Sequence, residues 1–135
     1  MQLAEIQESF SFFDSWEDKY RFVIDLGRDL IPLDESNKRE ENLIRGCQSQ
    51  VWLVAEYDKT TDTLALTIDS DAHIVRGLIA IILTAYNEHS PTEILAFNIE
   101  ELFEELQLLQ HLSPTRGNGL RAMVARIRDV ASSYG

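Results

Sequence analysis

The sequence predicts an α+β fold in which helices pack around a small antiparallel sheet of about three strands. Three patterns predict this class: apolar residues at helical spacing before residue 32, two strand-like runs between residues 51 and 68, and renewed helical patterns from about residue 72. The chain has 135 residues, of which 44% are apolar, and this is enough for one domain with a hydrophobic core.

Two helices are predicted in the first 32 residues. The first covers about residues 3–12. Asp14 or Ser15 can cap the second, because an acidic residue follows three positions later. Pro32 is expected to stop that helix, and the polar residues 34–42 are expected to form an exposed connection. The apolar positions are Leu3, Ile6 and Phe10 in the first helix and Trp16, Tyr20, Val23, Ile24 and Leu30 in the second.

The sheet is predicted from residues 51–57, which are rich in strand formers, and residues 63–68, where apolar residues alternate with Thr and Ala. Residues 58–62 between them can form a hairpin loop. Residues 43–44 are expected to add a short third strand. This leaves residues 46–50 as a tight connection at the edge of the sheet.

Helices return in the second half of the chain. Residues 74–86 are apolar nearly all round, which predicts a helix buried in the core. Residues 90–93, Ser-Pro-Thr-Glu, form a capping box with proline at the first helical position. A short helix near residues 100–107 follows, and residues 113–114 can open the last helix. The buried face of that helix is expected to contain Leu120, Val124, Ile127 and Val130 or Ala131.

The net charge of −11 argues against nucleic acid and anionic lipid as partners. The charge is uneven. Residues 1–112 carry 8 basic and 22 acidic side chains (−14), whereas residues 113–135 carry four arginines and one aspartate (+3). The arginines of the last helix can be internal counter-charges or a docking patch, and we favour the internal interpretation.

The chain holds one cysteine, which excludes an internal disulfide, a Cys-x-x-Cys redox pair and a multi-cysteine metal site. The acidic start of the chain does not resemble an export signal, and the longest apolar run, residues 74–86, is broken by Arg76 and is too short to span a bilayer. We therefore expect a soluble, cytoplasmic protein that does not bind membranes.

Cys47 lies between two expected strands, in the sequence Arg-Gly-Cys-Gln-Ser-Gln. Gly46 removes side-chain bulk beside the sulfur and permits backbone angles that other residues resist. Polar neighbours are typical of an exposed reactive thiol, whereas a structural cysteine usually lies among apolar residues. From the residues alone, both interpretations stay open.

A solitary thiol suits few reactions. A thiol hydrolase needs a base, and no Cys/His pair can be inferred from the spacing of His73, His89 and His111. A disulfide oxidoreductase needs a resolving cysteine, which is absent from the sequence. A persulfide carrier needs one cysteine only, because a second thiol could collapse the persulfide to a disulfide.

Three segments resemble the SufE family, the sulfur acceptors of cysteine desulfurases, including its CsdE branch. They are residues 46–52 (GCQSQVW), residues 69–77 (DSDAHIVRG) and residues 111–120 (HLSPTRGNGL). The resemblance extends from about Phe10 to Arg128 and implies a single sulfur-acceptor domain over residues 1–135, with an architecture like that of the IscU scaffold proteins. It does not separate the SufE branch from the CsdE branch.

The resemblance implies that Cys47 takes sulfur from a cysteine desulfurase of the SufS or CsdA type, stimulates that enzyme, and passes the sulfur to a SufBCD-type scaffold. The pyridoxal phosphate (PLP) then belongs to the desulfurase, and this chain needs no cofactor and no metal. A homodimer stays open. The alternative is a regulatory binding module of a desulfurase in which the cysteine is not essential.

Other residues are assigned to the loop and its partner. Gly46, Gln48, Ser49 and Gln50 are expected to shape the loop or contact the partner. Asp71 is expected to cap the buried helix, and Asp69 or Asp71 can also anchor the loop. Arg116 is expected to hold the loop or face the partner. We also expect Cys47 to be partly buried until docking, because free thiols readily attack a persulfide.

Overall fold

The structure is a computed structural model that describes residues 2–46 and 49–134, so Cys47 and Gln48 lie outside the described residues. A hairpin of two strands, β1 (Val51–Asp58) and β2 (Thr63–Ser70), forms the sheet. The helices are α1 (Leu3–Phe12), α2 (Trp16–Arg28), α3 (His73–Tyr86), α4 (Pro91–Ala96), α5 (Ile99–Glu105), α6 (Leu108–His111) and α7 (Pro114–Tyr134). Two 3₁₀ turns, η1 (Glu35–Asn37) and η2 (Glu40–Asn42), lie in the connection from α2 to β1. The α+β class is confirmed.

The predicted third strand is wrong as a full element. β1 and β2 pair antiparallel from Val51↔Ser70 to Asp58↔Thr63, but the segment before β1 contributes only one bridge, Leu43↔Trp52. The chain enters this bridge from the 3₁₀ turn η2 and leaves it at Gly46, whose φ is +92°. These two bends leave no extended stretch long enough for further pairs.

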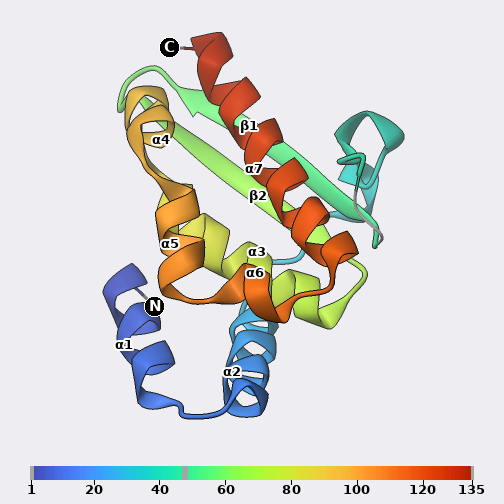
Figure 1. Ribbon diagram of the computed structural model, residues 1–135. Coiled ribbons are helices and arrows are strands. Elements are labelled where there is room, and N and C mark those ends of the chain that lie inside the picture. Colours follow the sequence, from blue (N-terminus) through green and yellow to red (C-terminus); the bar gives the residue numbers. More distant parts are fainter. Residues whose placement is uncertain (1, 47–48, 135) are drawn as a thin grey trace.

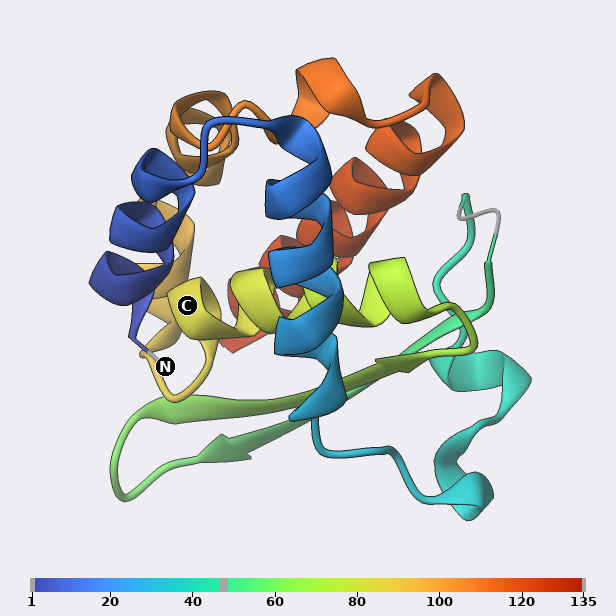
Figure 2. The same cartoon turned by 90° about the horizontal axis from the view of Figure 1, so that it is seen from below.

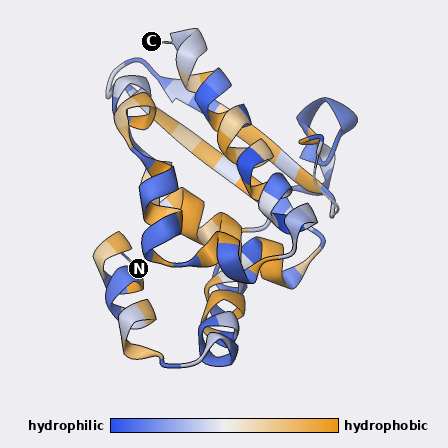
Figure 3. Ribbon diagram, viewed as in Figure 1, coloured by the Kyte–Doolittle hydropathy of each residue, from blue (hydrophilic) through white to orange (hydrophobic). Residues whose placement is uncertain are grey.

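Helix α3 lies between the sheet and α2 and is the centre of the core (Figures 1 and 2). Its predicted burial is confirmed, since most of its side chains are buried among those of the strands and the other helices. Helix α7 crosses the sheet beside α3, and the predicted buried positions Leu120, Val124, Ile127 and Ala131 face the core. Apolar residues concentrate on the strands and α3, whereas the connection before β1 is hydrophilic (Figure 3).

Two predicted caps are confirmed. The Ser15 side chain accepts a hydrogen bond from the Asp18 N–H at the start of α2. Ser90 and Glu93 form the reciprocal capping box of α4, and these hydrogen bonds with Ser90 lower the pKa of Glu93. Helix α2 ends at Arg28, before the predicted stop at Pro32.

The close crossing of α2 and α3 depends on two glycines. A Cβ added at Gly77 would collide with the backbone carbonyl of Val23, and one added at Gly27 would lie 2.6 Å from the Gly77 nitrogen. Two helix backbones approach this closely only where no side chain separates them. The crossing fixes how the N-terminal helices sit on the core.

We predict that Gly77→Ala lowers the free energy of unfolding by about 1–3 kcal/mol or more, the usual cost of overpacking, because the obstacle is backbone that cannot rotate away. Chemical denaturation measures this. Gly117→Ala in α7 is the matched control, since its Cβ would meet only Leu109 Cδ2 at 3.7 Å. Equal stability of the two variants would contradict the role given to the crossing.

The arginines of α7 are in part internal counter-charges. The Nε atom of Arg121 lies 3.7 Å from Glu100 Oε1, and Arg126 donates a hydrogen bond to the carbonyl of Glu41.

Within residues 2–46 and 49–134, no helix combines the length and hydrophobicity needed to span a bilayer.

Candidate functional site

The candidate site is the loop that joins the Leu43 bridge to β1, residues 45–50. Its ends are brought together by the hydrogen bond from the Ile44 N–H to the Val51 carbonyl, at 2.8 Å. Gly46 begins the turn with a left-handed φ of +92°, a conformation that glycine adopts without strain. A Cβ added at Gly46 would lie 3.5 Å from the Ala122 Cβ of α7. The predicted need for glycine is confirmed, while Cys47 and Gln48 lie outside the described residues.

Asp71 anchors the C-terminal end of this loop. Its Oδ1 accepts a hydrogen bond from the Gln50 N–H at 3.1 Å, and the Asp71 N–H donates to the Gln50 carbonyl at 3.3 Å. The prediction that Asp71 caps α3 is wrong, because the residue at the cap position is Ala72, which has no polar side chain. The alternative interpretation, in which Asp71 holds the loop, agrees with these bonds.

We predict that Asp71→Ala speeds hydrogen exchange of the Gln50 amide by roughly fivefold, because the lost hydrogen bond contributes about 1 kcal/mol. Amide exchange followed by NMR measures it. Asp71→Asn keeps the accepting oxygen and serves as the control, with exchange close to that of the original protein. If the alanine variant exchanged no faster, the anchor would be unimportant.

Arg116 lies on the other side of the loop, in the first turns of α7. It lines a small cavity of about 20 Å³ together with Ser49 of the loop and apolar residues of β1, α3 and α7. Its Nη1 atom is buried and has no hydrogen-bond partner within the described part of the chain. Since a buried donor without a partner is costly, this nitrogen is available to a group that enters or closes over the cavity.

A buried carboxylate, that of Asp69, lies two residues before the loop anchor Asp71 in the chain. Asp69, 1% exposed, accepts hydrogen bonds from the N–H groups of Leu33 (3.0 Å) and Ser70 (2.8 Å) and forms an ion pair with Arg76 of α3. The Lys38 ammonium lies 3.8 Å away. Asp69 thus ties the connection after α2 to the junction of β2 and α3.

The sequence prediction considered Asp69 as a loop anchor but missed its partners. Arg76 also donates to the Leu30 carbonyl at 3.1 Å, so it joins the segment that directly follows α2 to the same carboxylate. The sequence contained a signal for this ion pair, because Arg76 is a single charged residue inside an otherwise apolar helix. A buried charge requires a partner of opposite charge. Lys38 gave no such signal, since it lies in a polar connection.

We predict that Arg76→Met lowers the free energy of unfolding by about 3 kcal/mol, because it leaves the Asp69 carboxylate buried without its ion-pair partner. Thermal or chemical denaturation measures the change. Arg21→Met is the matched control: Arg21 pairs with Glu17 on the surface, where such a pair contributes less than about 1 kcal/mol. A similar small loss in both variants would refute the central role of Asp69.

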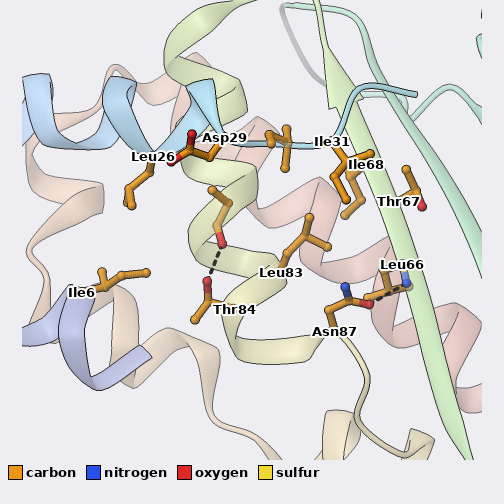
Figure 4. Close-up of a pocket in the computed structure, with 12 residues that line it drawn as sticks. Ile6, Leu26, Asp29, Ile31, Leu66, Thr67, Ile68, Leu83, Thr84 and Asn87 are labelled. Carbon is orange, nitrogen blue, oxygen red and sulfur yellow. Dashed lines mark hydrogen bonds between the residues drawn. The ribbon is translucent and has the colours of Figure 1, made fainter. Parts of the chain in front are cut away.

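Two other kinds of site, a metal centre and an apolar cleft, were sought among the described residues. No cluster of three or more His, Cys, Asp or Glu side chains that could hold a metal ion occurs among residues 2–46 and 49–134. A cleft of about 280 Å³ lies between α1, α2, α3 and β2, where Asn87 Oδ1 accepts a hydrogen bond from the Leu66 N–H (Figure 4). Its lining is mainly apolar, and it lies at the edge of the sheet opposite to the loop.

Comparison with known proteins supplies the family. The model of the SufE family, described as an Fe–S metabolism associated domain, matches residues 4–131. The chain belongs to the SufE family. An uncharacterized SufE-like protein of Rhizobium etli is 47% identical over 131 residues, which cover 96% of this chain and 88% of that protein. Another from Rhizobium meliloti is 43% identical, with 96% and 94% covered.

A solved structure shares the fold. The solution structure of a hypothetical protein from Thermus thermophilus has a TM-score of 0.76 and covers 97% of this chain and 93% of its own, at 16% identity. The match of the family model and the identity to the two SufE-like relatives confirm the predicted resemblance to SufE. Membership of this family, which is associated with Fe–S metabolism, implies a sulfur-transfer partner of a cysteine desulfurase.

Proposed function

We propose that this protein accepts a sulfur atom on Cys47 from the persulfide of a PLP-dependent cysteine desulfurase, stimulates that enzyme, and donates the sulfur to an iron–sulfur cluster scaffold of the SufBCD type. The Cys47 thiolate attacks the terminal sulfur of the desulfurase persulfide. A new S–S bond forms on Cys47, the old one breaks, and the desulfurase cysteine leaves as a thiolate. No external oxidant or reductant is needed.

The observation that carries this proposal is the place of the cysteine in the sequence, inside a loop whose described ends are held by the protein. The sole thiol of the chain belongs to a loop that is anchored by Asp71 on one side and faces Arg116 on the other. Gly46 leaves the start of the loop without a side chain, which gives a reacting sulfur close access. With no second cysteine in the chain, a persulfide on Cys47 has no internal thiol to attack it.

Ser49, Gln50, Asp71 and Arg116 hold the loop in this proposal, and Gln48 contacts the partner. The bonds of Asp71 with Gln50 lie at the surface, where a docking protein can exchange them for its own contacts. The buried Arg116 nitrogen offers a cationic donor that favours a thiolate or persulfide anion. PLP chemistry is supplied by the desulfurase, and this chain contributes the accepting sulfur.

We predict that Cys47→Ser abolishes stimulation of the cognate desulfurase, because the enzyme persulfide then has no acceptor. The rate of alanine release from cysteine, measured without added reductant, should rise with the original protein and stay at the level of the desulfurase alone with the variant. Circular dichroism verifies that the variant is folded.

The competing hypothesis is a regulatory module with a non-essential cysteine, and it predicts full stimulation by Cys47→Ser. Its motivating features are the acidic body and the basic last helix, which could recognise charged surfaces of a partner. The internal contacts of Arg121 and Arg126 weaken that argument, because they occupy two of the four arginines within the protein itself.

A further inference from the structure

A second hollow, far along α7 from the cysteine loop, carries charged groups that the proposed sulfur transfer does not use. Its lining residues come from α7 and from the residues that end α4, join it to α5 and begin α5, and its volume is about 430 Å³. Small-molecule sites commonly have volumes of about 300–1,000 Å³. The lining residues are Leu95, Ala96, Phe97, Asn98, Ile99, Glu100, Val124 and Arg128.

The hollow has a cation and an anion that do not pair with each other. Arg128 is half-buried and forms no ion pair within the described residues, and Glu100 lies 3.7 Å from Arg121 instead. The rest of the wall is apolar apart from Asn98, whose side chain accepts the Glu101 N–H at the start of α5. Arg128 and Glu100 have opposite charges and line the hollow together with apolar side chains. This combination suits a ligand that carries a negative group, a positive group and a hydrophobic group.

Tyr86 contacts one wall residue of this hollow. Its ring packs edge-on against Phe97, which lines the hollow, with centroids 6.0 Å apart. The hydroxyl is buried, and the Arg128 side chain is its polar neighbour. Burial raises the pKa of this phenol, and the neighbouring Arg128 partly offsets the effect.

We propose that this hollow binds a free α-amino acid with an apolar side chain. The Arg128 guanidinium pairs with the carboxylate of the ligand, Glu100 accepts its ammonium group, and the apolar wall contacts its side chain. The site is separate from Cys47, so it goes beyond the sulfur-acceptor function and does not depend on it.

Three probes test the two charge contacts by NMR titration of the full chain: L-leucine, leucinamide, which lacks the carboxylate, and N-acetyl-leucine, which lacks the ammonium group. Leucine at millimolar concentration should shift the amide signals of Asn98 to Glu100 saturably. Leucinamide and N-acetyl-leucine should each bind at least several-fold more weakly, because each loses one ion pair.

Arg128→Gln should weaken leucine binding several-fold, whereas the matched variant Arg126→Gln, two residues away on the same helix and outside the hollow, should bind as the original protein does. The proposal is overturned if leucine causes no saturable shifts near Asn98, if the three probes bind equally, or if both variants bind alike. Sulfur acceptance by Cys47 is unaffected by each of these outcomes, so the two proposals fail independently.

Discussion

The pairing of one buried carboxylate with one arginine organises the end of the molecule at which the cysteine loop lies. Asp69 is almost fully buried, and a charge in that position is stable only if neighbouring groups neutralise and hydrogen-bond it. Arg76 supplies the charge and, through its bond to Leu30, also secures the end of α2. Two residues after Asp69, the chain reaches Asp71, which holds Gln50. Because Asp69 is fixed in the core and Asp71 is only two residues further on, the position of the loop anchor is fixed as well.

The glycine crossing and this ion pair are neighbours in sequence. Gly77 follows Arg76, so the residue that lets α2 approach α3 lies next to the one that ties α2 to Asp69. Close approach is what brings the Leu30 carbonyl within reach of the arginine. The segment of residues 69–77 therefore combines packing, charge compensation and loop anchoring, and this gives a physical reason why it forms one of the three segments that resemble the family.

Local signals predicted most of the fold. The helical spacing in α1, the cap at Ser15 and the capping box at Ser90 each depend on residues within a few positions of one another, and all three occur as expected. The third strand failed because two bends, at η2 and at Gly46, limit pairing to Leu43. The cap assigned to Asp71 failed because its side chain reaches across space to Gln50, a partner 21 residues away that no local pattern reveals. The role of Cys47 was assigned from a motif, and its expected partial burial stays a prediction because Cys47 lies outside the described residues.

The proposed function depends on whether the sulfur of Cys47 can carry a second sulfur atom. Mass spectrometry of the intact protein after incubation with the cognate desulfurase and cysteine tests this most directly. We predict a gain of one sulfur atom, located on the peptide that contains Cys47 and removed by a thiol reductant. A protein of unchanged mass, or a sulfur adduct that persists in Cys47→Ala, would contradict it.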